Sequence, residues 1–383
     1  MMAGARIVIL GGGFGGITAA VELRNALSGA HVITLVDRRP TFMMGLRKLW
    51  VLDGRGTIGD GTRPLSALSA KGISLHQGTV THIDPASRTV ATDAGTLTYD
   101  YLVIALGAEP RPDLVPGFSN AVFNLYDAAD VERLALRVKS FTAGRVVIGI
   151  LGVPYKCPPA PYEAALLLHD LFEQRGLRRA IQMAAFTPQP MSLPVVGAAG
   201  CAQVEGRLAA SAIAFMPGRK IDRLESSAAI TEKGTIEADL FIAVPPHRPP
   251  AVIKSSGLQM TGEWLFADPV TMRTSDPRVY AVGDVIEIPL ANKMPLPKAG
   301  VFAESQAKVA ASHIAAEIGG GHSSVTFDGR GFCFIEIGKG QAAKVQGHFT
   351  APNGPQVEVT PPSETALKEK IAFERTRLDA WFS

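Results

Sequence analysis

The stretch RIVILGGGFGGITAAVEL, residues 6–23, decides the fold. It predicts a buried strand over residues 6–10, a glycine-rich turn, and a helix over residues 17–27. The next apolar run ends at Asp37, which lies 21 positions beyond Gly16. In a βαβ unit the glycines let the backbone approach a pyrophosphate at the helix N-terminus, and the carboxylate accepts hydrogen bonds from a ribose. We therefore expect a dinucleotide site made by Gly11, Gly13, Phe14, Gly15, Gly16, Asp37 and Arg38.

Composition limits the class of protein. The 383 residues are 46% hydrophobic and 19% charged, with a net charge of +3 and no Lys/Arg-rich run, so nucleic-acid binding has little support. No run reaches the roughly 18 apolar residues that span a bilayer. The first strand begins at Arg6, which leaves no room for a signal peptide, so we expect a cytoplasmic protein. No metal site is predicted.

A second βαβ pattern follows a crossover that is rich in proline. It comprises a strand over residues 145–151, a helix over residues 162–174 and a strand over residues 181–186. The fold class expected is α/β, with two Rossmann-like domains, an arrangement that resembles the glutathione-reductase-like FAD/NAD(P) fold, and a small C-terminal α+β region. The expected division is 1–111 with 251–320 for the first domain, 112–250 for the second, and 321–383 for the C-terminal region.

Two later motifs indicate which dinucleotide the first domain binds. Ala105-Leu106-Gly107 and Val282-Gly283-Asp284 resemble the remaining signatures of flavoproteins with two dinucleotide-binding domains. That resemblance implies FAD, with Asp284 on its ribityl chain and the helix over residues 300–318 pointing its N-terminus at the flavin. The other expected FAD contacts are Val80, Lys298 and Ala299.

The second glycine loop departs from the nucleotide-binding pattern. It reads Gly152-Val153-Pro154-Tyr155-Lys156-Cys157-Pro158-Pro159. Proline lacks an N–H and carries a bulky ring, so this loop is unsuited to a pyrophosphate. The following strand ends in Phe186-Thr187-Pro188, without a carboxylate for a ribose. The sequence therefore predicts that the site for NADH or NADPH is lost.

The segment Lys156–Glu163 resembles the cysteine-bearing loop of sulfide:quinone oxidoreductases and of the flavoprotein subunit of flavocytochrome c sulfide dehydrogenase. The similarity continues through residues 244–248 and 297–304 and ends at Gly331-Phe332-Cys333-Phe334, where those families keep a second cysteine. It implies oxidation of sulfide through a redox pair of Cys157 and Cys333. Flavocytochrome c binds its FAD through a cysteine near residues 43–44, and none stands here, so the FAD should be non-covalent.

Other residues near these motifs are assigned less specific roles. Lys156 can favour the thiolate of its neighbour, Glu163 and Glu304 can relay protons or simply stabilise their helices, and Cys201 is expected to be inert. Arg47 and Lys48 either neutralise FAD phosphates or face solvent.

The electron acceptor is expected to be a membrane quinone, by analogy with sulfide:quinone oxidoreductases, on the inner face of the cell membrane. In the tail, apolar residues recur near helical spacing at Leu367, Ile371, Leu378 and Phe382. This stripe either dips into a membrane interface or packs against the protein body or a second copy of a homo-oligomer. A type II NADH:quinone oxidoreductase and a non-catalytic redox sensor remain alternative functions.

Overall fold

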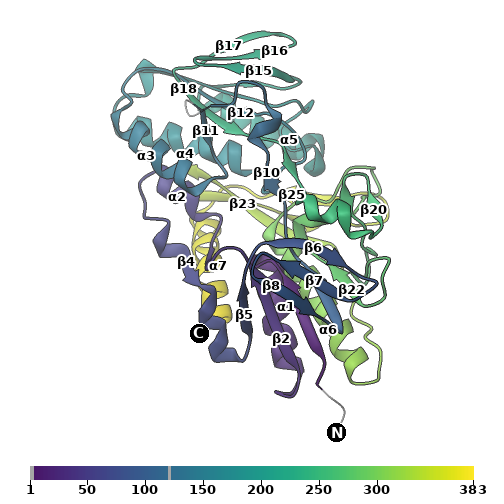
Figure 1. Cartoon of the computed structure of the whole chain (residues 1–383). Coiled ribbons are helices and arrows are strands. Elements are labelled where there is room, and N and C mark those ends of the chain that lie inside the picture. Colours follow the sequence, from purple (N-terminus) through teal and green to yellow (C-terminus); the bar gives the residue numbers. More distant parts are fainter. Residues whose placement is uncertain (1–3, 120–121) are drawn as a thin grey trace.

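The computed structural model describes residues 4–119 and 122–383, and its core consists of two five-stranded parallel sheets (Figure 1). The strand order of the first sheet is β22-β9-β1-β2-β5. Its strands are β1 (Arg6–Leu10), β2 (Val32–Asp37), β5 (Ser74–Gln77), β9 (Tyr101–Ile104) and β22 (Val279–Ala281). Helices α1 (Phe14–Ala26) and α6 (Gly300–Ile318) pack against each other beside this sheet.

Helix α1 begins three residues earlier than the sequence predicted. The N–H of Ile17 donates to the carbonyl of Gly13 at 3.0 Å, so the glycine turn is already part of the first helical turn. Helix α6 has the predicted bounds.

The second sheet has the order β11-β18-β12-β13-β14 and confirms the second βαβ unit. Its strands are β11 (Val122–Asn124), β12 (Gly144–Ile150), β13 (Ile181–Phe186), β14 (Ile213–Met216) and β18 (Leu240–Val244). Its helices are α3 (Ala128–Ser140), α4 (Ala160–Gln174) and α5 (Gly197–Ala210). The α/β fold class is therefore as expected, while the exact domain boundaries stay a proposal.

Short elements connect and flank the two sheets. They are α2 (Arg47–Leu52), β3 (Thr41–Met43), β4 (Thr62–Pro64), β6 (Val80–Asp84), β7 (Thr89–Thr92), β8 (Gly95–Thr98), β10 (Glu109–Pro110), β15 (Ile221–Glu225), β16 (Ala228–Thr231), β17 (Gly234–Glu237), β19 (His247–Arg248), β20 (Met260–Thr261) and β21 (Trp264–Leu265). Strands β10 and β19 pair antiparallel where the chain crosses between the sheets.

The C-terminal part forms a third sheet and a long helix. Strands β23 (Arg330–Gly338), β24 (Gln341–His348) and β25 (Gln356–Val359) pair antiparallel, and α7 (Glu364–Phe382) follows. Strand β23 packs on α4 of the second sheet, whereas α7 contacts β24, β23 and α1. In Figure 1 the yellow α7 runs from beside α2 toward the end of β5. The C-terminal part thus connects the two sheets.

The apolar stripe of α7 packs against the protein body. Leu378 and Trp381 are buried, and the Trp381 ring lies 5.2 Å from that of Phe14 and 5.3 Å from that of Phe42. Ile371 is the exception, because 50% of it is exposed. Of the two expectations for this stripe, packing on the body is the one observed for its C-terminal half.

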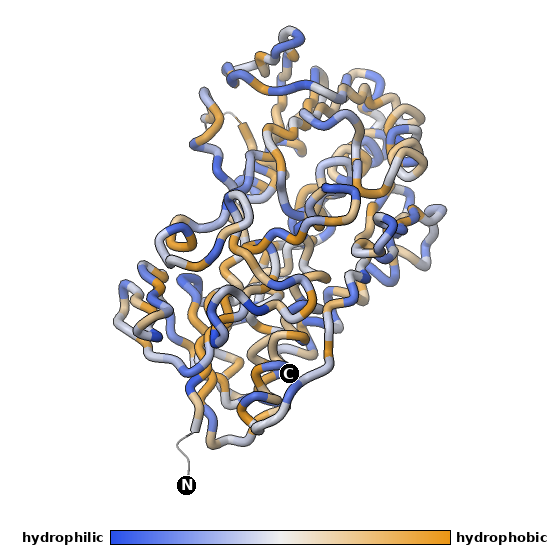
Figure 2. The backbone as a smooth tube through the Cα atoms, turned by 90° about the vertical axis from the view of Figure 1, so that its right-hand side faces the viewer, coloured by the Kyte–Doolittle hydropathy of each residue, from blue (hydrophilic) through white to orange (hydrophobic). Residues whose placement is uncertain are grey.

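Within residues 4–119 and 122–383, no helix is both long enough and apolar enough to cross a bilayer. Hydrophilic residues interrupt the hydrophobic ones along the tube of Figure 2.

Candidate functional site

The glycine turn is held close to the backbone around it. Gly11 has a φ of 104°, a conformation that favours glycine, and a Cβ on Gly16 would lie 1.8 Å from the carbonyl oxygen of Gly11. By contrast, a Cβ on Gly13 would meet nothing within 4 Å. The turn therefore leaves open space at the N-terminus of α1, where an anionic pyrophosphate is favoured.

The three motifs found in the sequence converge at this turn. A Cβ on Gly15 would lie 3.0 Å from the side chain of Val282 and 3.6 Å from that of Ala105, and one on Gly11 would lie 2.3 Å from the carbonyl oxygen of Ala105. Residues about 90 and 270 positions further along the chain thus border one space. This convergence fits a dinucleotide that lies across the carboxyl ends of β1, β9 and β22.

Asp37 also supports the turn itself. Its Oδ2 accepts a hydrogen bond from the N–H of Gly12 at 2.6 Å, and its Oδ1 accepts one from the N–H of Arg39 at 2.8 Å. A carboxylate has further lone pairs for a ribose, so the expected role is compatible with these bonds. Arg38 is exposed and pairs with Glu109.

Asp284 lies in a turn that directly follows β22. Among the described residues its carboxylate has no hydrogen-bond partner, and burial raises its pKa. Lys298 donates from Nζ to the carbonyls of Asp284 and Ile286 at 2.9 and 3.0 Å, and its Nζ lies 3.3 Å from the centre of the Trp264 ring. Lys298 therefore supports the turn from inside, and the free carboxylate of Asp284 fits a hydroxylated ligand such as the ribityl chain of FAD.

Three further residues expected to contact FAD lie near this space. Val80 begins β6, two residues after Gly78, whose N–H donates to the carbonyl of Asp37. The ring of Phe14 packs between α6 and α7, 2.9 Å from where a Cβ on Gly300 would lie. Ala299 is the N-cap residue of α6.

Cys157 and Cys333 are free thiols brought into contact from positions 176 apart in the sequence. Their side chains lie close enough for each thiol to act on the pKa of the other, and both are half-buried. The Cys157 thiol lowers the pKa of Cys333, while Cys333 and burial raise the pKa of Cys157. The pair therefore favours a thiolate at Cys333 and a proton at Cys157.

The loop that carries Cys157 lies against the segment that leads into α6. The N–H of Cys157 donates to the carbonyl of Lys298 at 2.7 Å. At the start of the loop, a Cβ on Gly152 would lie 2.6 Å from Cβ of Pro246. Pro246 thus packs tightly against the first residue of this loop, and the loop holds a cysteine beside Lys298.

Glu163 lies in a buried ionic cluster that the sequence reasoning did not foresee. It pairs with Lys370 of α7, which also donates to Glu336 of β23 at 2.7 Å. Each of the three side chains is at most 3% exposed. Burial raises the pKa of Glu163 to about 7, and Lys370 and Glu163 both act on Cys157 through their charges. In the sequence, this cluster is indicated only by Lys370, a charged residue that falls within the apolar stripe of the tail helix.

The cations near these motifs have partners that local sequence does not reveal. Arg47 pairs with the buried Glu374 of α7 and lies over the Trp50 ring, so it does not face solvent. Lys156 donates to the carbonyl of Ala108, and its charge interacts with the thiolate of Cys157, as expected. The charge of Lys370 lowers the pKa of Cys157 as well.

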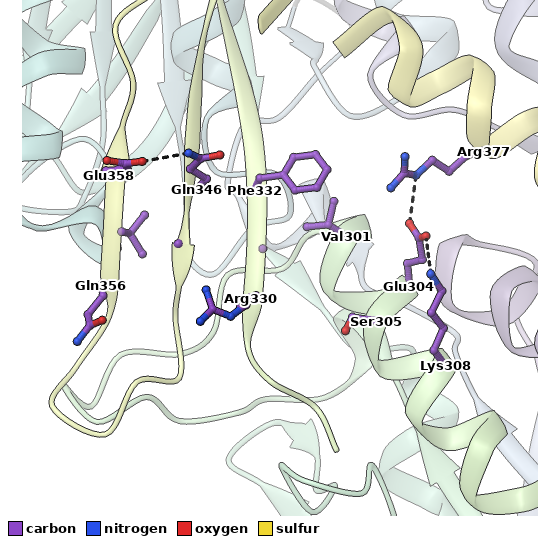
Figure 3. A pocket seen from close by; sticks show the side chains of 13 residues that line it. Val301, Glu304, Ser305, Lys308, Arg330, Phe332, Gln346, Gln356, Glu358 and Arg377 are labelled. Atoms are coloured by element: carbon purple, nitrogen blue, oxygen red, sulfur yellow. Dashed lines mark hydrogen bonds and ion pairs between the residues drawn. The ribbon is translucent and has the colours of Figure 1, made fainter. Parts of the chain in front are cut away.

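Glu304 lies in a groove of about 860 Å³ between α6, the third sheet and α7 (Figure 3). Its carboxylate is held between Lys308 at 3.3 Å and Arg377 at 3.2 Å. Phe332 of β23 forms part of the same wall. Cys201 is buried in α5, and its inert role stays a prediction.

Comparisons with known proteins agree with this architecture. A family model for pyridine nucleotide-disulphide oxidoreductases matches residues 5–307. The sulfide-quinone reductase of Aquifex aeolicus is 29% identical over 335 residues, which are 82% of this chain and 76% of that protein. The crystal structure of the sulfide:quinone oxidoreductase from that bacterium has a TM-score of 0.88 at 25% identity and covers 99% of this chain and 91% of that one. An alternative NAD(P)H-ubiquinone oxidoreductase of Arabidopsis thaliana is 27% identical over 202 residues, 46% of this chain and 38% of that protein.

The glycine turn generates a paired prediction. Gly16→Ala should lower the free energy of unfolding by about 3 kcal/mol, because its Cβ meets a backbone oxygen. Gly13→Ala should lower the free energy of unfolding by less than about 1 kcal/mol, because a Cβ has room at this position. The same substitution should weaken FAD binding by roughly tenfold or more, because the Cβ enters the open space at the N-terminus of α1. Urea unfolding of the apoprotein and titration with FAD measure the two effects. Equal stability of the two variants would contradict this prediction.

Non-covalent binding of FAD has its own test. Heating the wild-type protein should release intact FAD into solution.

The ionic cluster generates a second prediction. Lys370→Met should lower the free energy of unfolding near pH 8 by about 3–5 kcal/mol, because the buried Glu163 loses its counterion and Glu336 keeps only Arg55. Folding raises the pKa of Glu163 from 4.5 to about 7, so the stability that this carboxyl contributes is present below pH 4.5 and is lost as the pH rises to about 7. The deficit of the variant should therefore shrink toward pH 4.5.

Lys368→Met is the matched control, because Lys368 is exposed on the same helix. It should change stability by less than about 0.5 kcal/mol at either pH. Thermal or urea unfolding between pH 4.5 and 8 gives the comparison, and a pH-independent deficit for Lys370→Met would refute the assignment.

Proposed function

The chain belongs to the pyridine nucleotide-disulphide oxidoreductase family and is an FAD-dependent oxidoreductase, and from this premise we propose that it oxidises sulfide through Cys157 and Cys333 and passes the electrons to a quinone. The observation that supports this most is the pair of neighbouring cysteines, brought together from distant parts of the chain, with Cys157 held against the segment that leads into α6. The similarity to sulfide-quinone reductase supports the substrate and the acceptor.

The sulfur chemistry follows from the different properties of the two cysteines. In the oxidised pair, hydrosulfide attacks Sγ of Cys157, a new sulfur–sulfur bond forms, and the Cys157–Cys333 bond breaks. The electron pair of the broken bond leaves on Cys333 as its thiolate. The products are a persulfide on Cys157, which keeps the hydrogen of hydrosulfide, and a thiolate on Cys333. Bound FAD supplies the two-electron acceptor that this oxidation requires.

Glu163 is proposed as the group that exchanges protons with the pair. A base is most effective when its pKa is near the working pH, and burial places the pKa of Glu163 at about 7. Lys370 keeps the ionised form paired. Glu163 can therefore take a proton when the substrate enters as dihydrogen sulfide and release it after turnover.

The quinone is proposed to bind in the groove beside Glu304. Successive side chains of a strand point to opposite faces, so Phe332 lines the groove while Cys333 packs on the other face of β23, toward Cys157. The two halves of the reaction would thus lie on either side of one strand. Glu304, with Arg377 and Lys308 beside it, offers charged hydrogen-bonding groups to the quinone oxygens and a route for protons. Because quinones dissolve in bilayers, a peripheral location on the inner face of the membrane belongs to the same proposal.

An NAD(P)H:quinone oxidoreductase is the second candidate, supported by the similarity to the Arabidopsis enzyme over 202 residues. The prolines of the second loop, Pro154, Pro158 and Pro159, oppose it, because proline offers no N–H to a pyrophosphate. We expect sulfide to bleach the flavin absorption of the anaerobic holoenzyme rapidly, and micromolar NADH or NADPH to do so poorly. Stopped-flow spectroscopy with each donor decides between the candidates, and rapid bleaching by NADH alone would favour the second.

The cysteines give the sharper test. Cys157→Ser and Cys333→Ser should each lower sulfide-driven reduction of the flavin by roughly a thousandfold while FAD stays bound, since neither cysteine forms the disulfide alone. The double variant should be no worse than either single one. Cys201→Ser, at a buried position in α5, is the control and should keep wild-type rates. Wild-type turnover by both single variants would leave an FAD enzyme with another electron donor.

A further inference from the structure

Cys157 has a backbone conformation that is unusual for a residue with a side chain. Its φ is 51°, in the left-handed region that favours glycine. Such a conformation persists only where the surroundings hold it, and it is concentrated at functional sites. Here it lies at a cysteine whose thiol must meet a partner on another sheet.

Three hydrogen bonds hold the backbone of Cys157. Its N–H donates to Lys298, and its carbonyl accepts from the N–H of Ala160 at 3.0 Å and from the hydroxyl of Tyr126 at 3.1 Å. The bond to Ala160 lies within the loop and can move with it. Tyr126 is the one side chain among these partners and comes from a different strand end.

Tyr126 is itself fixed in place. It follows β11, and its N–H donates to Oδ1 of Asn124 at 2.9 Å. Its ring meets the ring of His247 edge to face at 5.0 Å, and His247 is fully buried with Nδ1 3.0 Å from the carbonyl oxygen of Pro245. Because the carbonyl accepts, Nδ1 is the donor and the imidazole is held in one orientation. The hydroxyl of Tyr126 is therefore a rigid donor.

These residues come from the carboxyl ends of three adjacent strands. Tyr126 follows β11, Cys157 follows β12 and His247 follows β18, and the sheet order is β11-β18-β12. In open α/β sheets this edge is where a ligand binds. In this chain the edge that would receive a pyridine nucleotide instead holds a cysteine.

We propose that Tyr126 is a positioning residue that holds Cys157 in its left-handed conformation and thereby keeps the Cys157 thiol on Cys333. This inference rests on the proposed role of the cysteine pair. Without the hydroxyl, Cys157 relaxes toward negative φ, and its thiol withdraws from Cys333. Cys333 then loses the neighbouring thiol that lowers its pKa.

The test is alkylation of the reduced holoenzyme by iodoacetamide over a range of pH, with modification at each cysteine resolved by mass spectrometry. In Tyr126→Phe the midpoint of the Cys333 profile should move to higher pH by about 0.7 units, a fivefold change, because one neutral hydrogen bond is lost. Tyr155→Phe is the matched control: it removes a hydroxyl from the same region, but that hydroxyl bonds the carbonyl of Pro158 at 3.1 Å. Its profile should equal that of wild type.

Two further outcomes decide the matter independently of folding and of sulfide turnover. Tyr126→p-aminophenylalanine restores an N–H donor and should restore the wild-type profile, which a general loss of packing would not permit. An unshifted profile in Tyr126→Phe, or equal shifts in both phenylalanine variants, would overturn the proposal. Because alkylation needs no sulfide, a shifted profile in an enzyme that does not oxidise sulfide would separate this inference from the proposed function.

Discussion

A single ammonium group buried between two carboxylates joins the parts of this molecule that form the candidate site. Lys370 of α7 meets Glu163 of α4 and Glu336 of β23, and none of the three is exposed enough for water to replace a missing partner. Charges are costly to bury unless they are paired, so the three elements must dock together or not at all. Because Cys157 precedes α4 and Cys333 lies in β23, the same constraint sets the thiols against each other.

The sequence predicted the elements whose signals are local. The glycine turn, the two later motifs and helix α6 could be located because strand periodicity and glycine spacing are properties of a few neighbouring residues. The contact between Cys157 and Cys333 could be anticipated only through a family resemblance. The sequence did not predict the roles of Lys370, Glu336 and Tyr126, because these roles depend on partners far along the chain. From its neighbours in the sequence alone, Lys370 cannot be distinguished from the other charged residues of the tail helix.

The second sheet keeps a nucleotide-binding architecture, while its loop after β12 differs from a nucleotide-binding loop. The sheet order and the helix after β12 are retained, so the edge at the carboxyl ends of the strands still presents a loop to the first domain. Prolines remove N–H groups from this loop, and the N–H of Cys157 donates to the carbonyl of Lys298. Under the proposed function, the same scaffold presents a cysteine in place of a nucleotide. Function would then depend on the site and not on the fold.

The order of the residues in the chain has a consequence for biosynthesis. Both cysteines and both carboxylates leave the ribosome before Lys370, because α7 follows all of them. Until that helix emerges, Glu163 has no counterion at this place, while Glu336 can pair only with Arg55. The elements that carry Cys157 and Cys333 can therefore be fixed together by this cluster only after α7 has been synthesised. Completion of the cluster is thus a late event of synthesis, set by the position of Lys370 in the chain.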